Sequence, residues 1–350
     1  MSDFEYVGNL HVHSLHSDGA ATVEAIAQAA ARAGLDFVGV NDHSHICQSL
    51  HLEEEGFRRG VLVLIGSEVG KRYHHYLAYD LKECVRENDA KPQEVIDRVN
   101  EQGGFGFLAH PFEKGMPFLE RSLAYTWNDL SVKGYTGICI WNFSSRWKER
   151  VKTAIHGLYC VAFKAETLKG PSRETLSLWD TLCRSRKVVA VGGSDAHGSS
   201  LRWGPLRLRP LTYGCLLNTI NVHVLLRRVL SGDLQQAKQE IYGAMREGRL
   251  FVAHDGLRSA RGFRFSYVSG DVNLVTGEEA PFPGDGEIRV HLPNAGEIRL
   301  MRDGMLLRSW RAKDVSYRVE EKGVYRVEAY LKVPFFGWRP WIFSNPVYLR

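Results

Sequence analysis

Two spacings of hydrophobic residues alternate along roughly the first 255 residues of the chain. Apolar residues recur every three or four positions in some segments and form short continuous runs in others. The runs are "YVGNLHVHS", "LDFVGVND", "GVLVLIGSEVG", "HYLAYDL", "FGFLAHP", "TGICIWN" and "KVVAVGGSDAH". The runs predict strands and the longer spacing predicts amphipathic helices. Strands that alternate with helices are typical of parallel β-α units.

Capping residues set the expected ends of the helices. Thr22 is placed to begin an alanine-rich helix that Gly34 ends, and Pro92 begins "PQEVIDRVNEQ". Ser172 precedes a helix over "RETLSLWDTLCRSRK". Two further helices are expected, over "TINVHVLLRRVLS" and "LQQAKQEIYGAMREG".

After His254 and Asp255 the pattern changes to a period of two, with turns at Gly and Asn and no helical spacing. "RDGM" is a hairpin signal within this part. We therefore expect two domains, residues 1–255 and 256–350, the second a small all-β, sandwich-like module.

Composition narrows the class of protein. A chain of 350 residues, 44% apolar, can form one large domain or two. No run approaches the roughly 20 apolar residues of a membrane span, and "MSDFEYVGNL" does not resemble a secretory leader. Six scattered cysteines without a C-x-x-C pair indicate reduced thiols. We expect a cytoplasmic protein with no membrane partner. The net charge of +5 allows anionic substrates without indicating nucleic acid.

Residues able to bind metal gather where the predicted strands end. His11 and His13 stand at i and i+2 on a strand, so both side chains lie on one face. The full set is His11, His13, Asp18, His43, Glu68, His75, His110, Asp195 and His197. One tetrahedral zinc needs four ligands, so nine residues suit two or three ions. Nitrogen and oxygen ligands without thiolate favour Zn, Mn or Fe, and they indicate a catalytic rather than a structural site.

These residues also carry a family resemblance. "HVHSLHSDG", "NDHSH", "GSE", "HHYLAY", "AHP" and "GSDAH" occur in the order of the PHP (polymerase and histidinol phosphatase) family of metal-dependent phosphoesterases. The resemblance covers residues 1–255 and implies an α/β fold, a distorted (β/α)7 TIM-like barrel with a metal centre at its C-terminal edge.

The resemblance also implies how the ligands divide among the ions. His11, His13, Glu68 and Asp195 resemble the ligands of a first ion. Glu68 would bridge to a second ion, which His75 and His110 complete. Asp18, His43 and His197 resemble ligands of a third. His74 remains a rival of its neighbour His75.

The tail resembles the C-terminal β-module of carbaryl-hydrolase-like PHP metallohydrolases, on "GVYRVEAYL" and "WRPWIFSNPVYLR". One departure is Cys139 in "GICIWN", where relatives often have Glu. Because Cys139 is not among the nine, the resemblance leaves the metal centre complete. The role of this module, which could cap the barrel, shape a pocket wall or dimerise, is left open.

The chemistry that we predict is hydrolysis of a phosphomonoester or phosphodiester by a hydroxide held between two metal ions. Glu68 would bridge the ions, Asp195 would bind one ion and accept the proton of water, and His197 could stabilise the leaving oxygen. Cations for a small anionic substrate are Lys71, Arg72, Arg202 and Arg207.

Two alternatives stay open. The same centre could hydrolyse a carbamate or carboxylic ester, which the tail resemblance favours, or the chain could be a non-catalytic metal-binding module. A pocket lined by two or more cations would favour phosphate. Nucleic acid is possible as a substrate but not indicated, and the chain has no polymerase-sized region.

Overall fold

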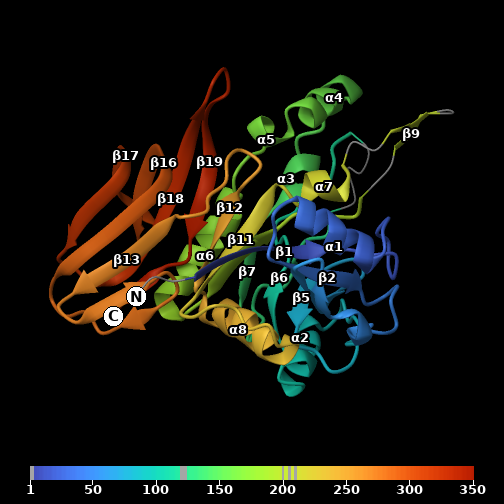
Figure 1. Ribbon diagram of the computed structural model, residues 1–350, viewed down its shortest axis with the longest axis horizontal. Helices are drawn as coiled ribbons and strands as arrows, with labels where there is room; N and C mark the ends of the chain where they lie inside the picture. Colours follow the sequence, from blue (N-terminus) through green and yellow to red (C-terminus); the bar gives the residue numbers. More distant parts are fainter. Residues whose placement is uncertain (1–3, 119–123, 199–200, 204–205, 209–210) are drawn as a thin grey trace.

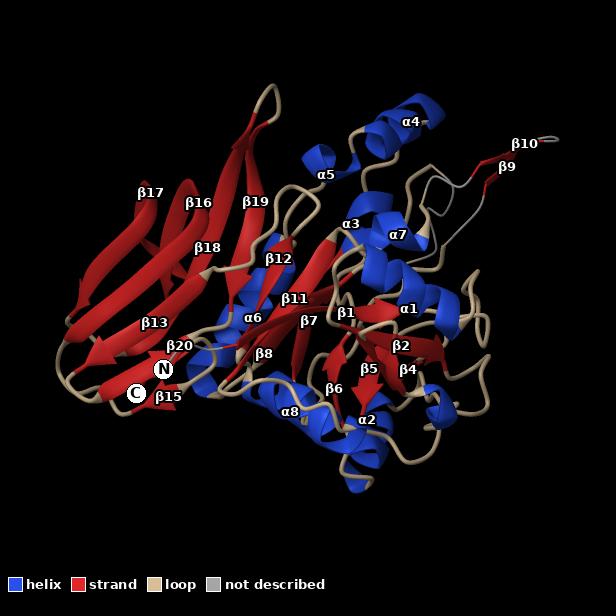
Figure 2. Ribbon diagram, viewed as in Figure 1, coloured by secondary structure: helices blue, strands red, loops and turns tan. Residues whose placement is uncertain are grey.

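We describe a computed structural model of the chain, which covers residues 4–118, 124–198, 201–203, 206–208 and 211–350, with the backbone alone at 201–203 and 206–208. Figure 1 shows an α/β part, coloured blue to yellow, beside an all-β part in orange and red. In Figure 2 the helices gather around the first part, and the second consists of strands and loops. The mixed α/β class is thus confirmed.

The α/β part is built on strands that are mostly buried, apart from the short strand Gly56–Arg58. They are β1 (Phe4–Val12), β2 (Phe37–His43), β3 (Gly56–Arg58), β4 (Val61–Val69), β5 (Tyr76–Tyr79), β6 (Phe105–Leu108), β7 (Gly137–Asn142), β8 (Val189–Gly193), β11 (Ile220–Leu226) and β12 (Leu250–His254). A separate hairpin pairs β9 (Leu201–Trp203) with β10 (Leu206–Leu208). β1, β2 and β4 pair in parallel, as do β6, β7 and β8, whereas β5 is antiparallel to both neighbours.

The helices lie around this sheet, and most of them bury apolar residues against it. They are α1 (Val23–Arg32), η1 (Leu52–Glu54), α2 (Pro92–Glu101), α3 (Phe143–Lys148), α4 (Ala154–Ala162), α5 (Lys164–Thr167), α6 (Arg173–Ser185), α7 (Tyr213–Leu216) and α8 (Leu234–Glu247). The predicted caps are present, since Thr22 and Ser172 accept backbone N–H groups at the starts of α1 and α6. Among the described residues, no helix is long and apolar enough to cross a membrane.

The sheet does not close as a regular barrel. β1 meets the chain that follows β8 through a single parallel bridge between Val12 and Ala196. Its other pairing on that side is antiparallel to β11, which continues the sheet into β12. The distorted (β/α)7 TIM-like barrel of residues 1–255 therefore stays a prediction.

The helix expected over residues 219–231 is wrong, because Ile220–Leu226 is strand β11. All seven residues are buried, and the strand lies between β1 and β12. Ile220, Val222 and Val224 are β-branched, which suits a strand buried on both faces. A short apolar run cannot be assigned by periodicity alone, since a buried strand and a buried helix look alike.

The all-β part begins after β12 and contains β13 (Arg264–Ser269), β14 (Val272–Val275), β15 (Glu279–Ala280), β16 (Gly286–Arg302), β17 (Met305–Val319), β18 (Gly323–Val333), β19 (Gly337–Ser344) and β20 (Val347–Leu349). The hairpin expected at "RDGM" is confirmed, since Asp303 and Gly304, with φ of 50° and 83°, turn β16 into β17. Such positive values are those of a type I′ turn.

The described residues form two hydrophobic cores. One fills the α/β part, and the other lies mainly between strands of the all-β part. Phe343 and Tyr348 from the tail belong to the first core, while Phe251 and Ala253 of β12 belong to the second. The division into residues 1–255 and 256–350 stays a prediction.

Candidate metal centre

The nine candidate ligands come from strand ends at one edge of the sheet. His11 stands on β1 with His13 just after it, His43 ends β2, and Glu68 lies near the end of β4. The other ligands occupy the connections that follow or precede strands: Asp18, His75, His110, Asp195 and His197. Because the parallel strands end at the same edge, side chains far apart in sequence meet there.

Glu68 lies at the centre of the cluster, with its side chain 1% exposed. Its Oε2 is 3.3 Å from Nε2 of His11, 3.4 Å from Nε2 of His13 and 3.1 Å from Nδ1 of His43. Its Oε1 is 3.0 Å from Nδ1 of His75 and 3.2 Å from Nε2 of His110. One buried carboxylate therefore faces five imidazoles, as a bridging ligand would.

Asp195 completes the first group of ligands. Its Oδ1 lies 3.4 Å from Nε2 of His11 and 3.3 Å from Nε2 of His13. With Glu68 these residues form a buried set whose ligand atoms all lie within 4.8 Å of one another. Four nitrogen and oxygen atoms thus converge on one point.

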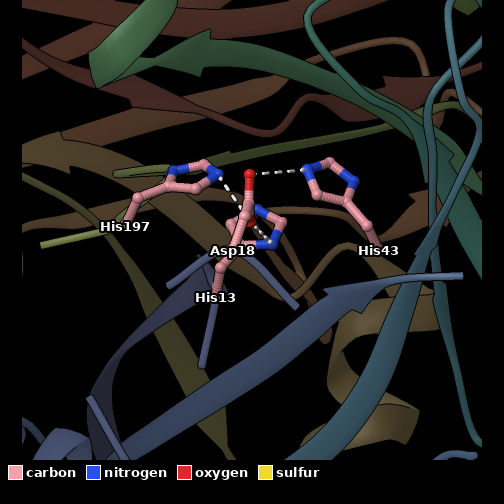
Figure 3. Close-up of side chains that lie close together, drawn as sticks. All are labelled: His13, Asp18, His43 and His197. Atoms are coloured by element: carbon pink, nitrogen blue, oxygen red, sulfur yellow. Dashed lines mark ion pairs between the residues drawn. The ribbon is translucent and has the colours of Figure 1, made fainter. Parts of the chain in front are cut away.

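A further set lies nearer the solvent (Figure 3). Asp18, with a side chain 45% exposed, stands between His197 and His43, while His13 lies behind it. The carboxylate is 3.3 Å from Nε2 of His197, 3.8 Å from Nε2 of His43 and 3.9 Å from Nδ1 of His13. His43, Glu68 and His75 form the remaining group, so the three groups share residues and are continuous.

The donor set fits divalent metal ions. Ligands at about 2.0–2.1 Å from a tetrahedral zinc lie about 3.4 Å from each other. The four nitrogen–oxygen distances of His11 and His13 to Glu68 and Asp195 are 3.3–3.4 Å. Both ring nitrogens of His11 and His13 are buried without a hydrogen-bond partner. Buried polar atoms ordinarily have partners, and a metal would serve as one here.

The electrostatics keep Glu68, Asp195 and His43 in their metal-binding forms. Burial disfavours the charged form of Glu68 and Asp195, yet the surrounding imidazoles, His11 foremost, hold both pKa values well below the usual range. Burial and the nearby His13 and His75 lower the pKa of His43 to about 2, against the pull of Glu68 and Asp18. The carboxylates are thus ionised and this imidazole is neutral, as metal ligation requires. At His110 and His197, burial favours the neutral ring, but nearby carboxylates raise the pKa of both to about 9, so these two imidazoles would lose a proton on binding a metal.

The side chains of the adjacent residues His74 and His75 point to different surroundings. His75 faces Glu68 through Nδ1. The Nε2 of His74 instead accepts the backbone N–H groups of Asn128 and Asp129, at 3.1 and 3.2 Å. The structure therefore brings His75, and not His74, into the cluster.

The backbone is constrained at two of the candidate ligands. His110 and Asp195 have φ of 27° and 54°, values that residues other than glycine rarely adopt. Gly193, on β8, approaches His11 so closely that a Cβ would lie 2.9 Å from the Cβ of that histidine. Strained residues and close approaches of this kind are concentrated at functional sites.

Comparison with known proteins agrees with the motifs, since residues 9–124 match the family model of the PHP domain. This part of the chain is similar to PHP domains. An uncharacterized protein of Methanocaldococcus jannaschii is 26% identical over 115 residues, which are 30% of this chain and 67% of that protein. The family resemblance predicted from the motifs is confirmed.

Among solved structures, the chain is similar to a two-domain protein from Bacteroides vulgatus that contains a predicted PHP-like metal-dependent phosphoesterase. The TM-score is 0.45 and the identity 15%, over 98% of this chain and 95% of that one.

The four candidate cations lie at different places relative to the candidate metal centre. The Arg72 guanidinium lies 5.6 Å from the centre of the Tyr125 ring, which is 5.0 Å from the ring of His75. Lys71 is exposed, and its backbone N–H donates to Asp89. The side chains of Arg202 and Arg207 lie outside the described residues.

The sequence analysis did not identify the residues that support the candidate ligands. Asp42 accepts Ser14 N–H at 2.8 Å, Ser14 Oγ at 2.7 Å and Ser17 Oγ at 2.5 Å, and so holds the loop that carries Asp18. Tyr213 donates its hydroxyl to the carbonyl of His13 at 2.6 Å. Asp42 stands inside the "NDHSH" motif and could have been noticed, whereas nothing near Tyr213 indicates its role.

Proposed function

We propose that the protein is a metal-dependent phosphoesterase that acts on a phosphomonoester or phosphodiester. The observation that carries the proposal is the geometry of Glu68, whose two oxygens each face separate groups of imidazoles in a buried site. Three overlapping donor groups suit two or three divalent ions of Zn, Mn or Fe, within a distorted (β/α)7 barrel.

Divalent ions bound at this edge would supply Lewis-acid chemistry, which polarises the ester and lowers the pKa of water. Glu68 and Asp195 would hold these ions in place and, as carboxylates, offset their charge. Asp195, whose Oδ1 faces His11 and His13, would accept the proton of the attacking water. His197, at the solvent side, is placed to assist the leaving oxygen.

Arg72 is the described cation that approaches the centre, through the Tyr125 ring. Arg202 and Arg207 remain candidates for the second cation that would favour phosphate over a neutral carbonyl group. Arg72 stacks near Tyr73 and Tyr125 and donates to the carbonyl of Ala124, so its guanidinium is held next to the ring that lies on His75. Arg146, in the pocket behind His110, pairs with Glu149. Arg72 is thus the described cation that we assign to a phosphoryl oxygen. Carbamate or carboxylic ester hydrolysis is the second candidate.

The proposal is tested by comparing the activity of one metal-loaded protein preparation on several substrates. Protein stripped of metal and reloaded with Mn or Zn is assayed on an aryl phosphomonoester, an aryl phosphodiester and an aryl carbamate. We expect turnover of a phosphoester that chelation abolishes and metal restores. Turnover of the carbamate alone, or no turnover by fully loaded protein, would contradict the proposal.

A further inference from the structure

Three buried polar residues lie behind the candidate ligands and belong to none of the donor groups. Glu113 follows His110 on the loop after β6, Asn142 ends β7, and Ser145 lies in the first turn of α3. Each is at most 5% exposed. Buried polar side chains of this kind cost free energy unless they are hydrogen-bonded, so their partners show what they do.

The three residues form a network that is hydrogen-bonded to Asp195 and lies within ion-pair distance of His110. Ser145 donates its hydroxyl to Oε2 of Glu113 at 2.5 Å, and its backbone N–H to Oδ1 of Asn142 at 3.0 Å. Asn142 donates its Nδ2 to Oδ2 of Asp195 at 3.3 Å. At the other end, Oε2 of Glu113 lies 3.5 Å from Nδ1 of His110.

At His110, the contacts of Nδ1 determine which ring nitrogen faces the cluster. Its Nδ1 lies 2.9 Å from the carbonyl oxygen of Tyr125, with the carboxylate of Glu113 beyond it. Two acceptors at Nδ1 favour the tautomer that carries its proton there. Nε2, which lies 3.2 Å from Glu68, then keeps its lone pair for a metal.

At Asp195, the hydrogen bond from Asn142 determines which carboxylate oxygen faces the cluster. The amide of Asn142 holds Oδ2, which leaves Oδ1 toward His11 and His13. Helix capping explains Asn142 and Ser145 without any metal, since Asn142 caps α3. Capping does not explain Glu113, whose one ion pair among the described residues is with His110 and whose Oε1 has no hydrogen-bond partner.

We propose that Glu113, Ser145 and Asn142 are positioning residues that orient His110 and Asp195 for metal binding. The inference rests on the proposed metal centre but not on the identity of the ester. Outer partners of metal ligands fix the tautomer and orientation of the ligand, and their loss costs about 10- to 100-fold in metal affinity.

The test measures metal affinity apart from catalysis. Apo-protein is titrated with Co²⁺ and Zn²⁺ against a chelating dye, and the absorption spectrum of the Co²⁺ form is recorded. Glu113→Gln and Ser145→Ala are compared with Ser145→Thr, which keeps the hydroxyl. Glu149→Gln is the matched control, because Glu149 lines the same pocket but contacts Arg146 instead of a ligand.

We expect Glu113→Gln and Ser145→Ala to weaken metal binding about 10- to 100-fold and to change the Co²⁺ spectrum. Ser145→Thr should restore much of the affinity, and Glu149→Gln should match the wild type. Unchanged affinity and spectrum in both variants would overturn the proposal, as would equal losses in Glu149→Gln.

The outcomes also separate this proposal from the proposed function. A wild type that binds Co²⁺ but hydrolyses no phosphoester contradicts the function alone, because the affinities still report on positioning. An active wild type with unchanged variants contradicts the positioning alone. A wild type that binds no metal contradicts both.

Discussion

At the scale of single residues, the site depends on one carboxylate. Glu68 faces five imidazole rings from four different strand ends or loops, and it is itself 1% exposed. A buried anion is costly unless cations compensate it. Metal ions are the cations that such a ligand set attracts, so Glu68 and the metal should stabilise each other.

We expect Glu68→Gln to bind less metal than the wild type. The amide keeps the shape of the side chain but removes the charge and one acceptor oxygen, so a bridging role is lost. Activity on a phosphoester should fall by more than the roughly 100-fold cost of losing an outer partner of a ligand. Metal analysis after dialysis and steady-state kinetics check both effects.

Glu53→Gln serves as the control for this variant, since Glu53 has a side chain 73% exposed and pairs with His51 at the surface. It should keep wild-type metal content and activity. Full metal content together with full activity in Glu68→Gln would show that Glu68 does not bridge metal ions.

The clustering of the candidate ligands could be predicted from sequence because each stands in a short motif at the end of an apolar run. Their supporting residues could not, since Asn142 acts through the cap of α3 and Glu113 through a loop conformation. In "GICIWN", Cys139 departs from the family pattern, but it is a buried apolar residue. The residue of this run that contacts a candidate ligand is Asn142, which donates a hydrogen bond to Asp195. Motif spacing places strand ends but does not determine such contacts.

At the scale of elements, the strand order explains a second buried cluster of charges. His223 on β11 lies 2.7 Å from Glu5 of β1 and 3.0 Å from Asp255, which follows β12. Arg264 of β13 also pairs with Glu5, at 2.7 Å. The helix expected over residues 219–231 would have separated these groups. The pairing of β11 between β1 and β12 brings the charged groups together. This long-range pairing cannot be predicted from the local spacing of hydrophobic residues.

This cluster predicts a pH dependence of stability. Burial disfavours the imidazolium of His223, but Asp255 and Glu5 outweigh it and raise its pKa to about 9. The stabilisation is therefore complete below the unfolded pKa of about 6.5 and is lost as pH rises through about 9. We expect the free energy of unfolding in urea to fall by up to about 3 kcal/mol between these values.

His223→Gln is the variant that assigns the effect. This variant should be less stable than the wild type near pH 6, because it lacks the charged imidazolium that the wild type has at this pH. It should also lose the part of the pH dependence that His223 contributes. Both proteins are measured with the same saturating metal, so that the metal centre contributes equally. Parallel pH profiles of the two proteins would mean that His223 does not carry this dependence.

At the scale of the whole molecule, the two parts share buried polar contacts. Arg326 of β18 donates to both oxygens of Asp180 on α6, at 2.7 and 2.9 Å, and to Glu328 at 2.6 Å. The guanidinium also lies 5.1 Å from the centre of the Trp179 ring. This contact ties the all-β part to the helix that covers β7.

Arg326→Met should lower the free energy of unfolding by about 3–5 kcal/mol, because it leaves two mostly buried carboxylates without their cation. Arg318→Met removes an exposed arginine, which pairs with Glu320 on the surface, and should change it by less than about 1 kcal/mol. Urea titrations of both variants provide the comparison. Equal and small effects would show that the Arg326 cluster adds nothing to stability.

A chain cut after Asp255 should not form the native α/β part, although the sequence pattern changes there. Phe343 and Tyr348 would leave gaps in the first core. The side chain of Asn345 accepts the N–H of Ala190 at 2.7 Å and donates to the carbonyls of Ala190 and Leu250, so these backbone groups of β8 and β12 would lose their partners. Uncovered apolar surface with unpaired backbone groups favours a loosely packed state. We expect residues 1–255 alone to bind a hydrophobic dye and to lack the near-ultraviolet circular dichroism of the full chain. A truncated chain with native dichroism and full metal binding would show instead that the α/β part folds independently of the tail.

Asn345→Ala in the full chain removes only the hydrogen bonds of this one side chain. We expect it to lower the free energy of unfolding by about 1–3 kcal/mol, because it leaves buried backbone groups unpaired.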